Sequence, residues 1–221
     1  MRSVKITLCL FFILATGCAK KPAIVSEEGN SNLAIDAEEL VYQGNYLGAA
    51  QIYSSLAKDP NNIGYYALAS LAYGDAGDFL SAESYLEKAA SRGLDTNLLT
   101  AAKSCSALRD GLAELAFTLA MRVDREQLTD FPFGKLLRCL GRAAYQTQRF
   151  RIAAEALGLA FGYPVPSLQV LTLSKITWAS LQKAYPEGRV PNVPDAYPIL
   201  RGWYELNSFF IQKKKLMIKL E

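Results

Sequence analysis

The sequence predicts an all-α protein of 221 residues. From Leu33 onward, apolar residues recur at intervals of three and four, which places them on one face of a helix. Beyond residue 31, no segment alternates apolar and polar residues over the length of a strand. A Gly-x-aromatic motif also recurs at an offset of 33 residues, at Gly44 and again at Gly77. A fixed period of this length is typical of helical repeat arrays.

Residues 1–17 have the composition of a bacterial export signal. Two cations, Arg2 and Lys5, precede an apolar run over residues 6–15, which is the order of charged and apolar regions in a signal peptide. The alternative is a membrane anchor, but this run is well short of the roughly 20 apolar residues that a helix needs to span a bilayer. We therefore expect the segment to be removed during export.

A cysteine follows the apolar run. The sequence LATGC at residues 14–18 resembles the lipobox of bacterial lipoproteins, although Ala15 stands where leucine is usual. The resemblance implies cleavage before Cys18 and a covalent lipid on it, and several acyl chains on one residue hold a protein stably at a membrane. No other cofactor is expected. Residues 18–31 are polar and aperiodic, so we predict a lipidated cysteine followed by a flexible spacer.

Repeated helix pairs are expected over residues 32–166. The first two units share a turn glycine, a turn aromatic, an alanine and a large apolar residue. These residues are Gly44, Tyr46, Ala49 and Tyr53 in the first unit, and Gly77, Phe79, Ala82 and Leu86 in the second. Glycine suits a left-handed turn between two helices, and alanine lets two helices approach closely where they cross.

Two further units match this pattern more weakly. The third lies around Gly111, and the fourth extends from Leu137 to Ala160, with Gln148 in place of the turn glycine. The four units resemble the tetratricopeptide repeat (TPR), a helix-turn-helix unit of about 34 residues. The resemblance implies a TPR-like helical solenoid in which the first helix of each unit lines an inner, concave face.

Residues 167–221 depart from the repeat pattern. A helix is expected over residues 167–184, with Leu168, Leu171, Trp178 and Leu181 on one face. A second helix is expected over residues 195–220, with Trp203, Leu206, Phe210 and Met217 as an apolar stripe. Because a repeat array needs an atypical end to cover its last apolar face, we interpret this pair as a degenerate fifth unit that caps the solenoid.

Charge is distributed unevenly along the chain. Residues 22–130 carry a net charge of −9, and residues 131–221 carry +8. In a linear fold, the two ends would present opposite electrostatic potentials to partners.

The residues that most often bind metals are few. Histidine is absent, which removes the commonest general base and metal ligand, so no metal site is expected. Only Cys105 and Cys139 remain once the signal is removed and Cys18 is lipidated. They could pair in an oxidising compartment, but two cysteines in apolar helical segments are more often small buried thiols, and we favour that interpretation.

Patterns that indicate catalysis are scarce. Ser180 and Lys183 match the Ser-x-x-Lys motif of penicillin-recognising enzymes, which raises the remote alternative of an envelope serine acyltransferase. The accompanying Ser-Asp-Asn and Lys-Thr-Gly elements do not follow in the sequence. We therefore expect a protein that is not an enzyme and has no catalytic residues.

A basic helix face is the strongest candidate for a binding site. Lys135, Arg138, Arg142 and Tyr145 follow one another at steps of three, four and three, which places them on one side of a helix. The TPR resemblance puts this side on the inner face, where Arg109 of the third unit would join them. Because guanidinium groups bind carboxylates through paired hydrogen bonds, we expect an acidic segment of a partner there. The competing interpretation is an ordinary solvated helix face.

Taken together, these features favour a lipid-anchored scaffold that mediates protein-protein interactions during assembly of an envelope complex. Lipoproteins of this form serve Flp/Tad or type IV pili and secretion systems, and we favour a pilus. The alternative is an adaptor lipoprotein for outer-membrane β-barrel assembly or for murein hydrolases. The expected location is the bacterial cell envelope, at the outer membrane facing the periplasm, because Ala19 after the cysteine resembles outer-membrane sorting. Other envelope proteins are the expected partners, and nucleic acid is not expected in that compartment.

Overall fold

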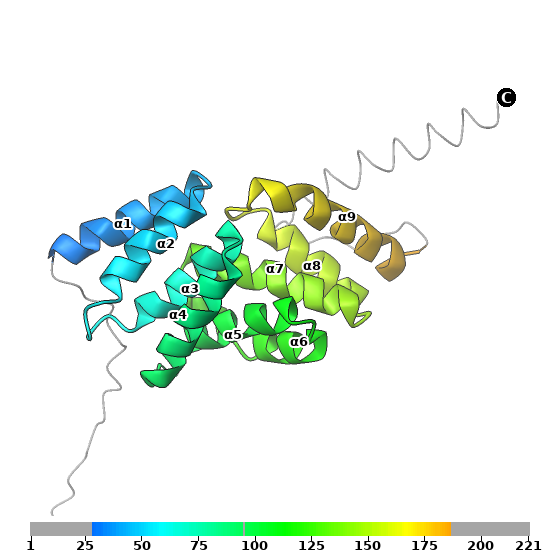
Figure 1. Cartoon of the computed structure of the whole chain (residues 1–221). Helices are drawn as coiled ribbons and strands as arrows, with labels where there is room; N and C mark the ends of the chain where they lie inside the picture. The colour runs from blue at the N-terminus through cyan, green and yellow to red at the C-terminus, as the bar shows by residue number, and fades with distance from the viewer. Residues whose placement is uncertain (1–27, 95, 187–221) are drawn as a thin grey trace, which may run out of the picture.

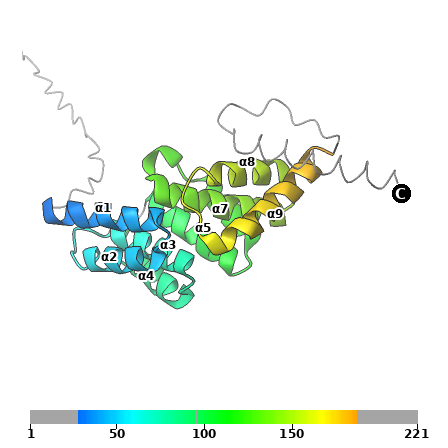
Figure 2. The same ribbon diagram turned by 90° about the horizontal axis from the view of Figure 1, so that it is seen from above.

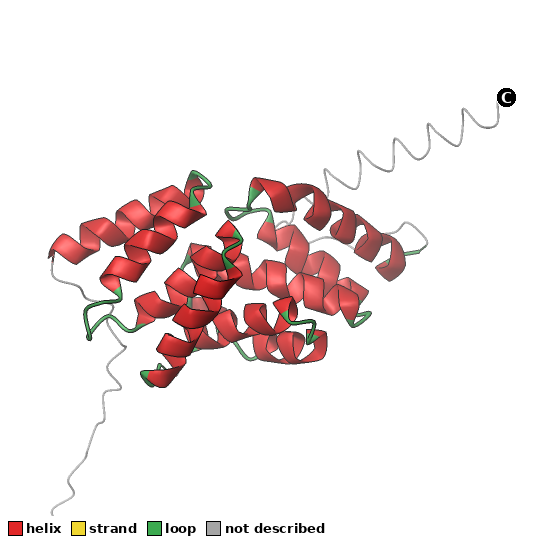
Figure 3. Ribbon diagram, in the orientation of Figure 1, coloured by secondary structure: helices red, strands yellow, loops and turns green. Residues whose placement is uncertain are grey.

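The structure, a computed structural model, describes residues 28–94 and 96–186, and this part of the chain is helical without strands (Figure 3). The predicted all-α class is confirmed. The helices are α1 (Glu28–Tyr42), α2 (Tyr46–Leu56), α3 (Gly64–Ala76), α4 (Phe79–Ser91), α5 (Asn97–Arg109), α6 (Ala113–Met121), the 3-10 helix η1 (Arg125–Gln127), α7 (Asp130–Gln146), α8 (Phe150–Ala160) and α9 (Ser167–Ala184). None of these helices is long and apolar enough to cross a membrane.

Short turns join the first eight α-helices into four pairs, and α9 follows as a single helix (Figure 1). The turn glycines Gly44, Gly77 and Gly111 have φ of +79°, +85° and +81°, so the predicted left-handed turns are confirmed. Gln148 takes the same place in the fourth pair with φ of +62°. A side chain in this conformation costs about 1–2 kcal/mol, and the packing of α7 against α8 must offset this cost.

Small residues lie where paired helices cross, as predicted. Ala49, Ala116 and Ala153 are fully buried. At the α7–α8 crossing, a Cβ atom built on Gly141 would lie only 2.4 Å from Leu157 Cγ. Glycine is therefore required there by close packing and not by its backbone conformation.

The start of α7 packs against the first helix pair. The Phe131 ring stacks on Tyr53 of α2 with centroids 6.3 Å apart, and Tyr53 stacks on Tyr65 of α3 at 6.0 Å. The hydroxyl of Tyr42, at the end of α1, donates to Asp130 Oδ2 at 3.0 Å. The fourth helix pair thus touches the first, although the two are far apart in the sequence.

Two sequence expectations about the ends of the array need correction. α1 begins at Glu28, so the last residues of the predicted spacer 18–31 are helical, because extending an existing helix costs little. On α9, Leu181 is buried as expected, but Leu168 and Leu171 are 93% and 65% exposed. The signal sequence, Cys18 and the predicted helix 195–220 lie outside the described residues.

The buried side of α9 is polar at several positions. Ser174, Thr177 and Ser180 are buried beside Leu173 and Leu181. The hydroxyl of Thr177 donates to Leu173 O at 2.8 Å, and that of Ser180 donates to Ile176 O at 2.7 Å. Because these hydroxyl groups bond to their own helix, they can be buried without an unsatisfied donor. Apolarity alone was therefore wrong for Leu168 and Leu171, but right for Leu181 and for Trp178, which packs against it.

Candidate functional site

Lys135 and Arg138, the first two residues of the predicted basic face, lie in the interior. They are 8% and 2% exposed, so the expectation that they line an open groove is wrong. Each bonds to a different carboxylate oxygen of Asp75, near the end of α3, and the Asp75 side chain is fully buried. The physical reason is that α7 packs against α3, which brings the basic face of one helix onto a carboxylate of the other.

Two further groups complete this buried ionic site. Arg138 Nη1 donates to Pro164 O, in the connection between α8 and α9, at 2.6 Å. Gln169 Nε2, in the first turn of α9, donates to Asp75 Oδ1 at 3.4 Å. We call Asp75, Lys135, Arg138 and Gln169 the Asp75 cluster. It ties α3, α7 and the start of α9 together and fills part of the face on which a groove was expected.

The Asp75 cluster contains two basic side chains and one carboxylate. Burial lowers the pKa of Lys135; Asp75 opposes this shift, whereas the positive charges of Arg138 and Arg142 add to it. Arg138 Nε is buried without a hydrogen-bond partner among the described residues. Burial, followed by the charge of Asp75, raises the pKa of the nearby Tyr46 to about 12. The cluster therefore joins the packed helices through buried ion pairs. Its two basic side chains share one carboxylate, so their positive charge is not fully balanced.

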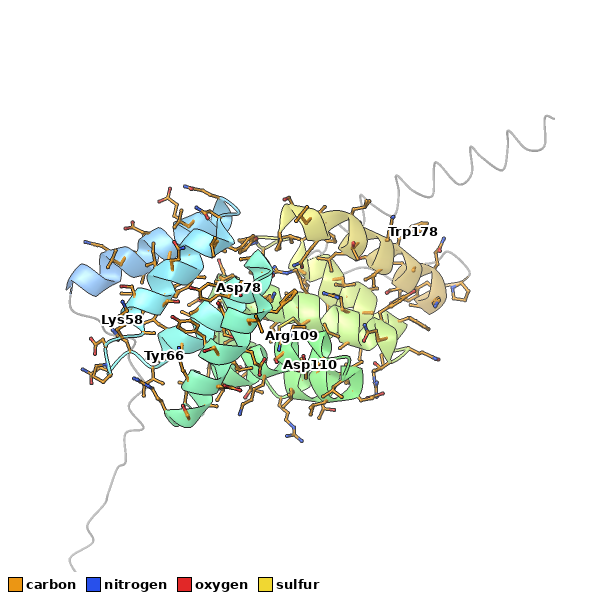
Figure 4. The ribbon with its side chains drawn as sticks, viewed as in Figure 1. Lys58, Tyr66, Asp78, Arg109, Asp110 and Trp178 are labelled. Atoms are coloured by element: carbon orange, nitrogen blue, oxygen red, sulfur yellow. A yellow bond between two sulfur atoms is a disulfide. The ribbon has the colours of Figure 1, made fainter. Side chains whose placement is uncertain are left out.

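Arg109 is not joined to the other predicted site residues. Its guanidinium pairs with Glu83 of α4 and with Asp110, the residue that follows α5 (Figure 4 labels Arg109 and Asp110). The hydroxyl of Ser106 also donates to Glu83 Oε2 at 2.9 Å. The hydrogen bond from Arg109 lowers the pKa of Glu83. Arg109 thus contributes to the seam between α4 and α5.

Arg142 and Tyr145 remain accessible at the far end of α7. Arg142 is exposed, and within the described residues it has no ion-pair partner. Tyr145 is half-buried and meets the edge of the Phe150 ring at 5.8 Å between centroids. Lys183, near the end of α9, places its Nζ 5.2 Å from the centroid of Tyr145 and 4.5 Å from that of Phe150. We call Arg142, Tyr145, Phe150 and Lys183 the basic–aromatic site.

Sequence reasoning missed Lys183 as part of this site because it treated the residue only as a partner of Ser180. The structure does not support that pairing. Ser180 is fully buried and its hydroxyl donates to Ile176 O, whereas the Lys183 ammonium lies over two aromatic rings. An activated serine needs a base within hydrogen-bond reach and a path to the substrate, and Ser180 lacks this path.

Cys105 and Cys139 form a disulfide between α5 and α7, with Cα atoms 5.3 Å apart. The favoured interpretation of two buried thiols is therefore wrong. The sequence did contain a signal for the bond. The separation of 34 residues is close to the offset of 33 between Gly44 and Gly77, so the two cysteines occupy similar places in the first helices of successive helix pairs.

No group of three or more acidic or cysteine side chains that could hold a metal ion occurs within residues 28–94 and 96–186. No protein-family model, curated protein or solved structure matches this chain significantly.

Proposed function

We propose that this protein is a lipid-anchored scaffold, built as a TPR-like helical array, that holds other proteins together while an envelope complex assembles. The observation that carries the proposal is the series of helix pairs with one turn geometry, at Gly44, Gly77, Gly111 and Gln148. Arrays of stacked helix pairs offer extended surfaces for other proteins. A pilus or secretion system is the favoured complex, with β-barrel assembly or murein-hydrolase recruitment as the alternative.

Export to the envelope is supported by two independent features. The sequence at residues 14–18 resembles a lipobox, with Ala15 in place of the usual leucine, and Cys105 pairs with Cys139. Disulfides form and persist outside the reducing cytosol. Both features are typical of a protein that leaves the reducing cytosol.

A binding role, and not catalysis, fits the side chains that are accessible. The two basic residues with the most unusual environment, Lys135 and Arg138, are held by Asp75, and Ser180 is buried. The exposed cations on the same helices include Arg142 and Lys183, which suit recognition of an anion.

Replacing Cys18 with alanine tests the anchor directly. We expect Cys18→Ala to accumulate as an unprocessed precursor without lipid, whereas Cys9→Ala, in the same apolar run, is processed and lipidated as in the wild type. Metabolic labelling with a fatty acid, followed by membrane fractionation and mass spectrometry of the N-terminus, measures both. A Cys18→Ala variant that is processed and remains at the membrane would overturn the lipoprotein assignment.

Cross-linking in cells then distinguishes the possible complexes. The lipidated protein should be recovered covalently joined to pilus or secretion components, and the Cys18→Ala variant should not. Recovery of β-barrel assembly proteins or of murein hydrolases would favour the alternative instead.

A further inference from the structure

We propose that the basic–aromatic site of Arg142, Tyr145, Phe150 and Lys183 binds an acidic peptide segment of a partner protein. The proposal deepens the scaffold function and rests on it for the identity of the partner as an envelope protein. The site lies where α7, α8 and α9 meet, beyond the buried Asp75 cluster.

The first argument is an excess of positive charge. Residues 131–186 contain seven basic residues and one carboxylate, Glu155. Glu155 pairs with Arg151, and Arg149 pairs with Glu114 of α6. Within the described residues, Arg142, Lys175 and Lys183 are left without a carboxylate partner. The surface around α7 and α9 therefore attracts anions.

The second argument is the charge beneath the surface. Lys135 and Arg138 share the single carboxylate of Asp75, and Arg142 lies one turn beyond Arg138 on the same helix face. Solvent ions screen buried charges much less than exposed ones. While Lys135 keeps its proton, the positive potential at Arg142 is therefore increased by the buried cations, and a carboxylate at the surface would relieve the repulsion among them.

The third argument is preorganisation. The Lys183 ammonium is held over the Tyr145 and Phe150 rings, at 5.2 Å and 4.5 Å, by attraction to the ring faces. A side chain that is already ordered loses less conformational freedom when a ligand binds. The half-buried rings also supply an apolar surface next to Lys183, and Tyr145 lies about one turn from Arg142 on α7. This surface fits a peptide chain better than a small inorganic anion.

The place of the site in the molecule favours a protein over a lipid surface. Figures 1 and 2 show α1 and α9 at opposite ends. The lipid on Cys18 would precede α1, where the chain is acidic, with a net charge of −9 over residues 22–130. The basic–aromatic site, at the other end of the described helices, therefore lies away from the tether and is open to a soluble segment of a partner.

The test uses the full protein as cells process it, purified in detergent, and a fluorescent hexaglutamate peptide as the probe. We expect the double variant Arg142→Glu/Lys183→Glu to weaken peptide binding at least about tenfold, because two attractive contacts become repulsive. The control Lys58→Glu/Lys103→Glu changes the net charge equally at two other exposed positions, and it should change binding less than about twofold. Fluorescence anisotropy at low and high salt measures the binding, and circular dichroism checks that each variant remains folded.

Several outcomes would overturn the proposal. One is that Arg142→Glu/Lys183→Glu binds the peptide as tightly as the wild type. Another is that both glutamate double variants weaken binding equally. A third is that the conservative variant Arg142→Lys/Lys183→Arg keeps its fold but loses binding. Displacement of the peptide by glycerol phosphate at the peptide's own concentration would instead indicate a phosphate or lipid-headgroup site. Peptide binding in this assay does not depend on lipid attachment. A negative binding result would therefore not affect the lipoprotein proposal, and a negative result for Cys18→Ala would not affect the peptide-binding proposal.

Discussion

Replacing Asp75 with asparagine would remove the single carboxylate of the Asp75 cluster while keeping its shape. Lys135 and Arg138 would then be buried without a counter-charge, since both bond to Asp75 in the wild type. Lys135 can reduce the cost by losing its proton, and its pKa is already lowered by burial. Arg138 has no such route, because a guanidinium remains charged in proteins.

The expected loss is a large part of the stability of the fold. Breaking a buried ion pair by removing one partner costs about 3–5 kcal/mol, whereas a domain has about 5–15 kcal/mol in total. With an m-value of about 2 kcal/mol per molar, the urea midpoint should fall by about 1.5–2.5 M. Urea titration followed by circular dichroism measures this shift.

The matched control is Glu155→Gln, which breaks the exposed pair between Arg151 and Glu155. Solvent and salt screen an exposed pair of this type, which contributes little to stability, so this variant should unfold close to the wild type. The double variant Asp75→Asn/Arg138→Met should recover part of the loss, because it removes the uncompensated charge. An Asp75→Asn protein within about 1 kcal/mol of the wild type would refute the argument that the cluster stabilises the fold.

Two other predictions concern the α5–α7 and α7–α8 contacts. Without reductant, Cys105 and Cys139 should resist alkylation in the denatured protein, and mass spectrometry that finds two free thiols would contradict the disulfide. The double variant Cys105→Ala/Cys139→Ala should lower the free energy of unfolding by about 2–4 kcal/mol. Gly141→Ala should destabilise by about 1–3 kcal/mol, because the added Cβ would lie 2.4 Å from Leu157 Cγ. At Gly64 a Cβ meets nothing within 4 Å, so Gly64→Ala should be neutral or slightly stabilising in thermal melts, and equal effects at both glycines would contradict the close packing.

The local features of the fold could be predicted because they depend on neighbouring residues. Helical spacing and the turn glycines Gly44, Gly77 and Gly111 are encoded within one repeat, and the structure has them as expected. Gln148 shows the limit of this reasoning, because it takes the same left-handed turn without being glycine. There the surrounding packing, and not the residue, determines the conformation.

The candidate site could be predicted only in part. Steps of three and four place Lys135, Arg138 and Arg142 on one side of α7, but spacing cannot show what packs against that side. What packs there is set by Asp75, 60 residues before Lys135, and by the tertiary arrangement that brings α7 against α3. Arg142 remains exposed because it lies one turn further along the helix, and Lys183 joins it from a helix that the repeat pattern did not describe.

The disulfide also affects how the protein would respond to force. If the protein is held at a membrane by its N-terminus, as we propose, a bound partner that moves away would pull on it. The chain from Cys105 to Cys139, a sequence separation of 34, would extend to roughly 110–120 Å if it unravelled. The covalent bond removes this length from the chain that tension can draw out, so the tethered molecule would stay short under load until the bond is reduced.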